Sequence, residues 1–168
     1  MYFLELLISG IAVGSLYALI AMGFVLIYKG TGVINFAQGE FVMLGGLIMV
    51  FFQVGVGIHP VFAFLLTIAS VTTIGIIVDR FAIRPIKKPS VLLLIIATIA
   101  CSMLIKGIAM YLWGKNPYDL PAFSGREPLI MFGAAIQPQA IWVIGFLAVT
   151  VTFLTLFFER SIIGKAMK

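Results

Sequence analysis

The sequence has little charge and few of the residues on which catalysis or metal binding depends. Only 10% of its 168 residues are Asp, Glu, Lys or Arg, whereas soluble domains carry about 25%. It has one cysteine, Cys101, and one histidine, His59. These counts exclude an internal disulfide and do not support a metal site. No nucleophile elbow and no phosphate-binding Gly-x-x-x-x-Gly-Lys-Ser/Thr motif is present, so we expect neither catalytic nor cofactor residues and no enzyme activity in this chain.

Hydrophobic residues make up 62% of the chain, and the mean hydropathy is +1.21. About 20 apolar residues are needed for a helix to cross the hydrocarbon core of a bilayer. The apolar runs show no alternating pattern and are hydrophobic on every face, as expected for helices among lipid and other helices. The sequence therefore predicts an all-α, polytopic transmembrane helical bundle with about five membrane segments. The predicted segments are Phe3–Tyr28, Phe41–Val56, Val61–Val78, Val91–Trp113 and Ala140–Phe158.

The second segment leaves two possibilities open. It is short, it contains Gly45, Gly46 and Gln53, and only Gly57-Ile-His-Pro60 separates it from the third segment. It either crosses the membrane completely or forms a broken or re-entrant helix.

The net charge of +5 comes from basic residues at the predicted membrane edges, which indicates topology and not nucleic-acid binding. Two segments, 79–90 and 159–168, have an excess of Lys and Arg, so we expect both in the cytoplasm. Residues 114–139 have balanced charge and several prolines, which is typical of an ordered external loop. This pattern places the N-terminus outside, but a re-entrant second segment would reverse it. Glu5 replaces the basic start of a signal peptide, so the first segment is expected to stay in the membrane.

Two features of the helices bear on packing. Gly10, Gly14 and Ala18 recur every fourth residue, which predicts a face on which another helix can approach closely. Lys106 lies inside the fourth segment, where a central charge costs about 2.5 to 3.5 kcal/mol. We expect its side chain to extend to the outer interface, with pairing to an acidic group across the bundle as the alternative.

A polar break follows the first segment. Residues 29–40 contain Gly30, Gly32 and Gly39 together with Asn35 and Gln38. Flexible backbone with amide side chains can line a solute path between half-helices. By composition alone, a cytoplasmic loop with glycine turns is the simpler interpretation.

Several sequence motifs, in a fixed order along the chain, favour the solute path over the cytoplasmic loop. They are Gly10-x-x-x-Gly-Ser-x-Tyr-Ala-Leu-x-Ala-x-Gly23, Leu26-Ile-Tyr28, Gly32-Val-Ile-Asn-Phe-Ala-Gln-Gly-Glu40 and Met43-Leu-Gly45. Together they resemble the permeases of branched-chain amino-acid ABC transporters. The resemblance implies one transmembrane permease domain over residues 1–168, corresponding to about the first half of a permease and incomplete at its C-terminus. It also implies a translocation path lined by Asn35, Phe36, Gln38, Gly39 and Glu40.

One position departs from the family pattern. Gln38 stands where members commonly have histidine, which keeps hydrogen bonding but removes titration near neutral pH. The substitution argues against a proton-linked role at this position and is compatible with a packing or solute-facing role.

The last residues carry a second resemblance. Gly164, Lys165, Ala166 and Met167 are similar to the start of the cytoplasmic loop through which these permeases contact their ATPase subunits. The family resemblance implies a multi-pass protein of the cytoplasmic (inner) membrane, surrounded by the lipid bilayer. The implied partners are a second permease subunit, two cytoplasmic ATPase subunits, an external solute-binding protein and a small-molecule solute. Permeases for urea or short amides share the scaffold, and a passive channel or a structural membrane subunit would have the same helix count.

Overall fold

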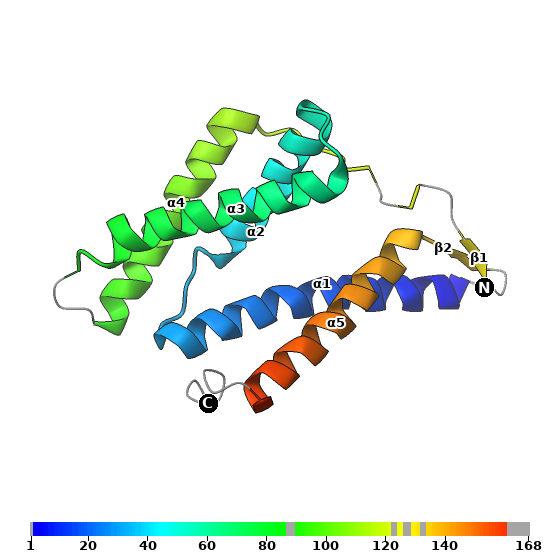
Figure 1. Ribbon diagram of the computed structural model, residues 1–168, viewed down its shortest axis with the longest axis horizontal. Coiled ribbons are helices and arrows are strands. Elements are labelled where there is room, and N and C mark those ends of the chain that lie inside the picture. Colours follow the sequence, from blue (N-terminus) through cyan, green and yellow to red (C-terminus); the bar gives the residue numbers. More distant parts are fainter. Residues whose placement is uncertain (1, 87–89, 122–123, 126–128, 132–133, 161–168) are drawn as a thin grey trace. The chain divides into compact units, whose positions relative to one another are not determined.

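The computed structural model describes residues 2–86, 90–121, 124–125, 129–131 and 134–160. Five helices in these ranges are long and apolar enough to cross a membrane, as predicted (Figure 1). The all-α, polytopic architecture is therefore confirmed. The long helices are α1 (Tyr2–Thr31), α2 (Gln38–Val50), α3 (Pro60–Val78), α4 (Val91–Trp113) and α5 (Pro138–Arg160).

Two of these helices continue into π-helical turns. The turn η1 (Phe51–Gly55) extends α2, and η2 (Asp79–Ile83) extends α3. Together, α2 and η1 form a continuous helical segment of 18 residues, which is not interrupted at Gly45 or Gly46. This segment begins at Gln38, three residues before the predicted start. Gln38, Gly39 and Glu40 therefore form the first turn of a helix, and the irregular break is limited to residues 32–37.

The chain divides into two compact units. The first unit comprises residues 1–30 and 121–168 and contains α1, α5 and a short hairpin. Strand β1 (Leu129–Met131) pairs in antiparallel fashion with β2 (Ala134–Ile136), with Leu129 opposite Ile136. This hairpin lies in the region predicted as an ordered external loop, and its three-residue strands are too short for the sequence pattern to indicate. The prediction of a single permease domain over residues 1–168 stays a prediction.

The second unit comprises residues 31–120 and contains α2, α3 and α4. Its core is formed where α2 meets α4, through Leu44 and Ile48 on one helix and Ile105 and Ala109 on the other. These residues repeat at four-residue intervals, which places each pair on one helical face. Side chains of α3 pack against the same cluster.

Most serine and threonine side chains of the long helices donate a hydrogen bond within their own helix. Ser15, Ser70 and Thr73 each donate a hydrogen bond to the carbonyl oxygen four residues earlier, at 2.8 Å. Three threonines of α5 do the same. Because lipid offers no hydrogen-bond partner, this local pairing lets a hydroxyl remain in a membrane helix without a partner from another segment.

The start of α4 is defined by a side-chain cap. Ser90 adopts an extended conformation, and its hydroxyl accepts a hydrogen bond from the Leu93 amide at 3.2 Å. Serine is a favoured residue at this position because it satisfies an amide that has no partner in the helix. The helix ends at Trp113, and the next residue, Gly114, has a φ of +79°, a conformation that favours glycine. Both ends of α4 agree with the predicted segment.

Candidate functional site

The break between α1 and α2 is held by its own polar groups. It begins at Gly32, which has a φ of +69°, a conformation that favours glycine. The side-chain oxygen Oδ1 of Asn35 accepts a hydrogen bond from the Ala37 amide at 3.0 Å. The Asn35 carbonyl accepts from the Gln38 amide at 3.2 Å. Asn35 thus forms a local turn that leads the chain into the first turn of α2.

This turn is attached to α4 by a hydrogen bond from its backbone. The Phe36 amide donates to Oγ1 of Thr98 at 3.3 Å, while the same hydroxyl donates to the Ile95 carbonyl at 2.9 Å. Thr98 is 3% exposed, and Ala37, next to the donor, is 1% exposed. The Thr98 hydroxyl therefore uses both its donor and its acceptor capacity, and it accepts from a backbone amide of the break.

A second hydrogen bond joins the first turn of α2 to α4. The Ser102 hydroxyl donates to Oε1 of Glu40 at 3.1 Å. Glu40 is half-buried, and it lies in the first turn of α2, where the helix dipole favours a negative charge. A carboxylate that accepts a hydrogen bond from another helix is more strongly held than one exposed on a surface.

These two hydrogen bonds place Phe36 and Glu40 beside the first half and the middle of α4. Thr98 is seven residues after the start of α4 at Val91, and Ser102 is the middle residue of this 23-residue helix. At 1.5 Å per residue, the two hydroxyls lie about 10 Å and about 17 Å from the start of the helix. Glu40 is consequently level with the middle of an apolar helix long enough to cross a membrane. A loop in the cytoplasm would instead lie beside the start of α4, next to the basic segment that precedes it.

The five residues predicted to line a path differ in their surroundings. Glu40 and the backbone of Phe36 contact α4 through hydrogen bonds, and Asn35 forms the turn. The Phe36 side chain is 48% exposed, and Gln38 is half-buried. No atom outside its own helix lies within 4 Å of a Cβ built at Gly39, so this face of the first turn is open. Their lining of a path stays a prediction.

Sequence reasoning did not find Thr98 and Ser102. Both lie in a segment that is otherwise hydrophobic on every face. The available signal was the spacing: Thr98, Ser102 and Lys106 recur every fourth residue and so share one side of α4. Their partners on α2 could not be inferred from that spacing.

The small-residue face of α1 is open within the first unit. No atom outside the helix lies within 4 Å of a Cβ built at Gly10 or Gly14. Ala18 lines a cavity of about 560 Å³ together with residues of α5. Lys29 and Phe158 line the same cavity, and the Lys29 ammonium lies 5.0 Å from the centre of the Phe158 ring. Close packing of another helix at Gly10, Gly14 and Ala18 stays a prediction.

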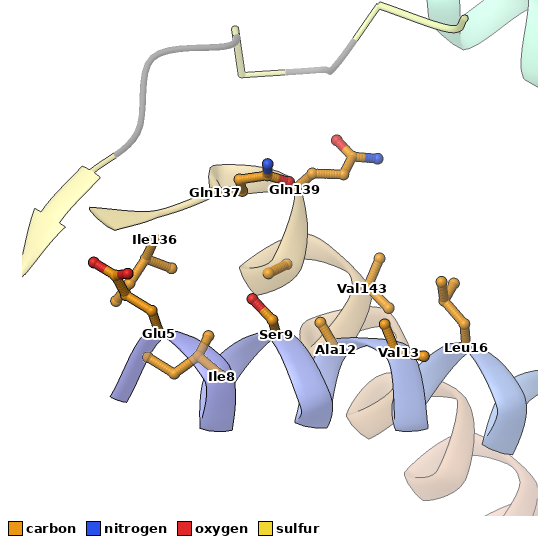
Figure 2. A pocket seen from close by; sticks show the side chains of 11 residues that line it. Glu5, Ile8, Ser9, Ala12, Val13, Leu16, Ile136, Gln137, Gln139 and Val143 are labelled. Atoms are coloured by element: carbon orange, nitrogen blue, oxygen red, sulfur yellow. The ribbon is translucent and has the colours of Figure 1, made fainter. Parts of the chain in front are cut away.

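A second cavity in the first unit has a polar lining. It has a volume of about 380 Å³ and lies between the N-terminal half of α1 and the start of α5. Figure 2 shows Glu5 and Ser9 rising from α1 below Ile136 and the first turn of α5. Gln137 and Gln139 complete the polar part of its wall. The predicted ATPase-contacting residues Gly164, Lys165, Ala166 and Met167 lie outside the described residues.

Comparison with known proteins identifies the family. Residues 6–168 match the family model described as "Branched-chain amino acid transport system / permease component". The chain belongs to this permease family. The predicted family resemblance is therefore confirmed, and with five helices able to span a membrane the chain is a multi-pass membrane protein.

Curated relatives agree with the family assignment. The chain is 29% identical to the high-affinity branched-chain amino acid transport system permease protein LivH of Salmonella typhimurium and of Escherichia coli, across its whole length. It is 30% identical to the permease protein BraD of Pseudomonas aeruginosa, across 99% of its length. The chain spans 58% of the length of each of these relatives. No solved structure matches it.

Proposed function

We propose that this chain forms part of the membrane permease of an ATP-driven importer that carries branched-chain amino acids across the cytoplasmic membrane. The translocation path runs past the break at residues 32–37 and the first turn of α2. The names of the relatives support the solute class. The position of the path is supported by the hydrogen bond between Glu40 and Ser102 at the middle of α4.

The physical argument concerns polar groups at membrane depth. A carboxylate in the hydrocarbon core is costly, and such residues face a bundle interior or a water-filled path. Irregular backbone at this depth is tolerated where it is buried in protein or lines a cavity. The break satisfies its part-buried Phe36 amide through Thr98, yet the Phe36 side chain and Gly39 remain accessible. This combination supports a surface that solute can reach.

The partners follow from the same proposal. The chain carries no phosphate-binding motif, so ATP hydrolysis is assigned to two cytoplasmic ATPase subunits. A second permease subunit completes the path, and an external solute-binding protein delivers the amino acid. Gly164, Lys165, Ala166 and Met167 contact the ATPases and transmit the movement that opens the path to alternate sides.

The experiment that tests this proposal is uptake of labelled leucine by the full-length importer reconstituted in vesicles. We expect uptake only with ATP on the ATPase side and binding protein on the opposite side. Ser102→Ala should lower the uptake rate about 10-fold, because hydrogen bonds to charged groups contribute about 1.5–3 kcal/mol. Ser70→Ala is the matched control, since its hydroxyl bonds only to the Leu66 carbonyl of its own helix.

Other outcomes would replace the proposal with a different function. Inhibition of uptake by urea at concentrations where other amino acids have no effect would indicate a permease for urea or short amides. Uptake that persists without ATP would indicate a channel. Absence of uptake under every condition would indicate a structural subunit. At the proposed ATPase contact, Gly164→Trp should leave ATP hydrolysis intact and abolish leucine uptake, and unchanged coupling of hydrolysis to uptake would contradict that contact.

A further inference from the structure

Helices α2, α3 and α4 contain two charged residues, and these have opposite signs. They are Glu40 on α2 and Lys106 on α4. Charged side chains inside membrane helices are rare and mark ion or substrate pathways, proton relays or ion pairs. The proposed function uses the position of Glu40 but assigns no role to Lys106.

The register between α2 and α4 brings the two charges close to each other. Ser102 is level with Glu40, because the two side chains share a hydrogen bond. Lys106 follows Ser102 by four residues, which is one helical turn, or about 6 Å along the axis. Since residues four apart lie on one side of a helix, Lys106 is on the side of α4 that carries Ser102.

The two charges nevertheless do not pair directly. Among the described residues, no carboxylate lies within 4 Å of the Lys106 ammonium, which is exposed. Helical side chains lean toward the N-terminus of their helix and cover the preceding turn. This geometry directs a side chain at position 106 toward the turn of Ser102 and away from the end of α4 at Trp113. The sequence predicts that the Lys106 side chain extends to the outer interface, which would require it to point opposite to this direction.

Apolar side chains of α2 continue beyond Glu40. Met43 and Leu47 follow it by three and seven residues, so they share its side of the helix. Both are half-buried and pack against the cluster where α2 meets α4. The described residues thus place the Glu40 carboxylate and the Ser102 hydroxyl beside apolar side chains of α2, with Lys106 one turn further along α4.

We propose that Glu40 and Lys106 are the two poles of a site that binds the zwitterionic end of an α-amino acid. Glu40 accepts hydrogen bonds from the substrate ammonium, and Lys106 donates to the substrate carboxylate. The apolar side chain of the substrate lies against Met43 and Leu47. The inference rests on the proposed function and deepens it, because it assigns each end of the solute to a residue.

The spacing suits this substrate. The charged groups of an amino acid sit on one carbon atom, so a carboxylate and an ammonium one helical turn apart can each contact the opposite group of the solute. Bound substrate then neutralises both charges of the pathway at once. A solute with only one of the two groups leaves either Glu40 or Lys106 without a partner at membrane depth, which is unfavourable.

The test measures equilibrium binding to the assembled full-length permease with its ATPases, in the absence of the solute-binding protein. Three labelled probes share the same hydrocarbon chain: leucine, 3-methylbutylamine without the carboxylate, and 4-methylpentanoate without the ammonium. We expect the wild type to bind leucine at least about 10-fold more tightly than either analogue, as expected for a charged hydrogen bond.

Neutralising each pole should affect the probes differently. Lys106→Gln should weaken leucine binding about 10-fold and leave the amine unchanged, because the amine never contacted Lys106. Glu40→Gln should weaken leucine and leave 4-methylpentanoate unchanged. The unchanged probe also shows that each variant is folded. The charge-preserving variants Lys106→Arg and Glu40→Asp should keep the preference for leucine.

Two results would overturn the inference. If Glu40 and Lys106 form an ion pair in the assembly, the double variant Glu40→Gln/Lys106→Gln would recover the leucine affinity that each single variant loses. If neither residue contacts solute, both single variants would bind leucine like the wild type. In either case ATP-dependent leucine uptake by the wild type would leave the proposed function standing. A wild type that transports no leucine would overturn both.

Discussion

The Ser102 hydroxyl donates to Glu40 at 3.1 Å, joining two residues that are 62 positions apart. The same separation recurs one turn earlier, where the Phe36 amide donates to Thr98. Further along, Leu44 and Ile48 of α2 share a core cluster with Ile105 and Ala109 of α4. Because the partners ascend together along both helices, α2 and α4 run parallel. The polar contacts therefore continue directly into the apolar core of the second unit.

Removing the Thr98 hydroxyl should destabilise the break. Thr98→Val keeps the shape of the side chain but leaves the Phe36 amide without its acceptor. Loss of this part-buried hydrogen bond should cost about 1 kcal/mol, so the full-length protein should unfold at lower denaturant and exchange this amide proton faster. The control is Thr73→Val, which removes only an exposed bond to the Ala69 carbonyl. Equal effects of the two variants would contradict the role of Thr98.

Enlarging Ala109 should disturb the contact between α2 and α4. Ala109 is 2% exposed and belongs to the core cluster, so Ala109→Leu forces extra atoms into a filled space. Overpacking of this kind costs about 1–3 kcal/mol. Denaturant titration of the purified full-length protein measures the loss. Ala100 on the same helix is exposed, so Ala100→Leu should have little effect. A larger loss of stability in Ala100→Leu than in Ala109→Leu would show that α4 packs through another face.

Replacing Gly32 should strain the turn after α1. Its φ of +69° is unfavourable for a residue with a Cβ, even though the space around it is open. Gly32→Ala should therefore cost about 1–2 kcal/mol. Gly39→Ala is the control, because Gly39 is helical and its Cβ would meet no atom within 4 Å outside its own helix. Alanine there should be neutral or stabilising by about 0.5–1 kcal/mol. Unfolding midpoints of both variants give the comparison, and an unaffected Gly32→Ala would contradict the left-handed turn.

The parallel arrangement of α2 and α4 also predicts the membrane topology. The basic segment before α4 predicts that α4 starts on the cytoplasmic side, so the start of α2 should face the same side. In a Cys101→Ser background, Lys29→Cys should react with a membrane-impermeant maleimide only after the membrane is permeabilised. Asn116→Cys, in the segment expected outside, should react in intact cells. Labelling of both positions from outside would indicate a re-entrant second segment and reverse the N-terminus.

The sequence allowed most of the architecture to be predicted. The boundaries of α4 agree with its apolar run, because transfer of each residue to lipid depends mainly on that residue's own hydrophobicity. The start of α2 was placed three residues late, because Gln38 and Glu40 interrupt the apolar run although they are helical. The short β1–β2 hairpin was not predicted, since three-residue strands carry too little pattern.

The site was predicted only in part. The break and Glu40 were located through the polar residues between two apolar runs and through the family resemblance. Thr98 and Ser102 were not, because a hydroxyl in a membrane helix is ordinarily satisfied by its own backbone, as Ser70 and Thr73 are. Nothing in the local sequence distinguishes the hydroxyls that turn to another segment.

The sequence by itself determined the membrane class, the number of long helices and the family of this protein, because hydropathy is a sum over neighbouring residues and the family strings are contiguous. Only the tertiary structure decided that Glu40 lies level with the middle of α4 and beside Ser102. That relationship depends on the register of two packed helices. The register is set by how Leu44 and Ile48 fit against Ile105 and Ala109, which is a property of both segments together and of neither alone.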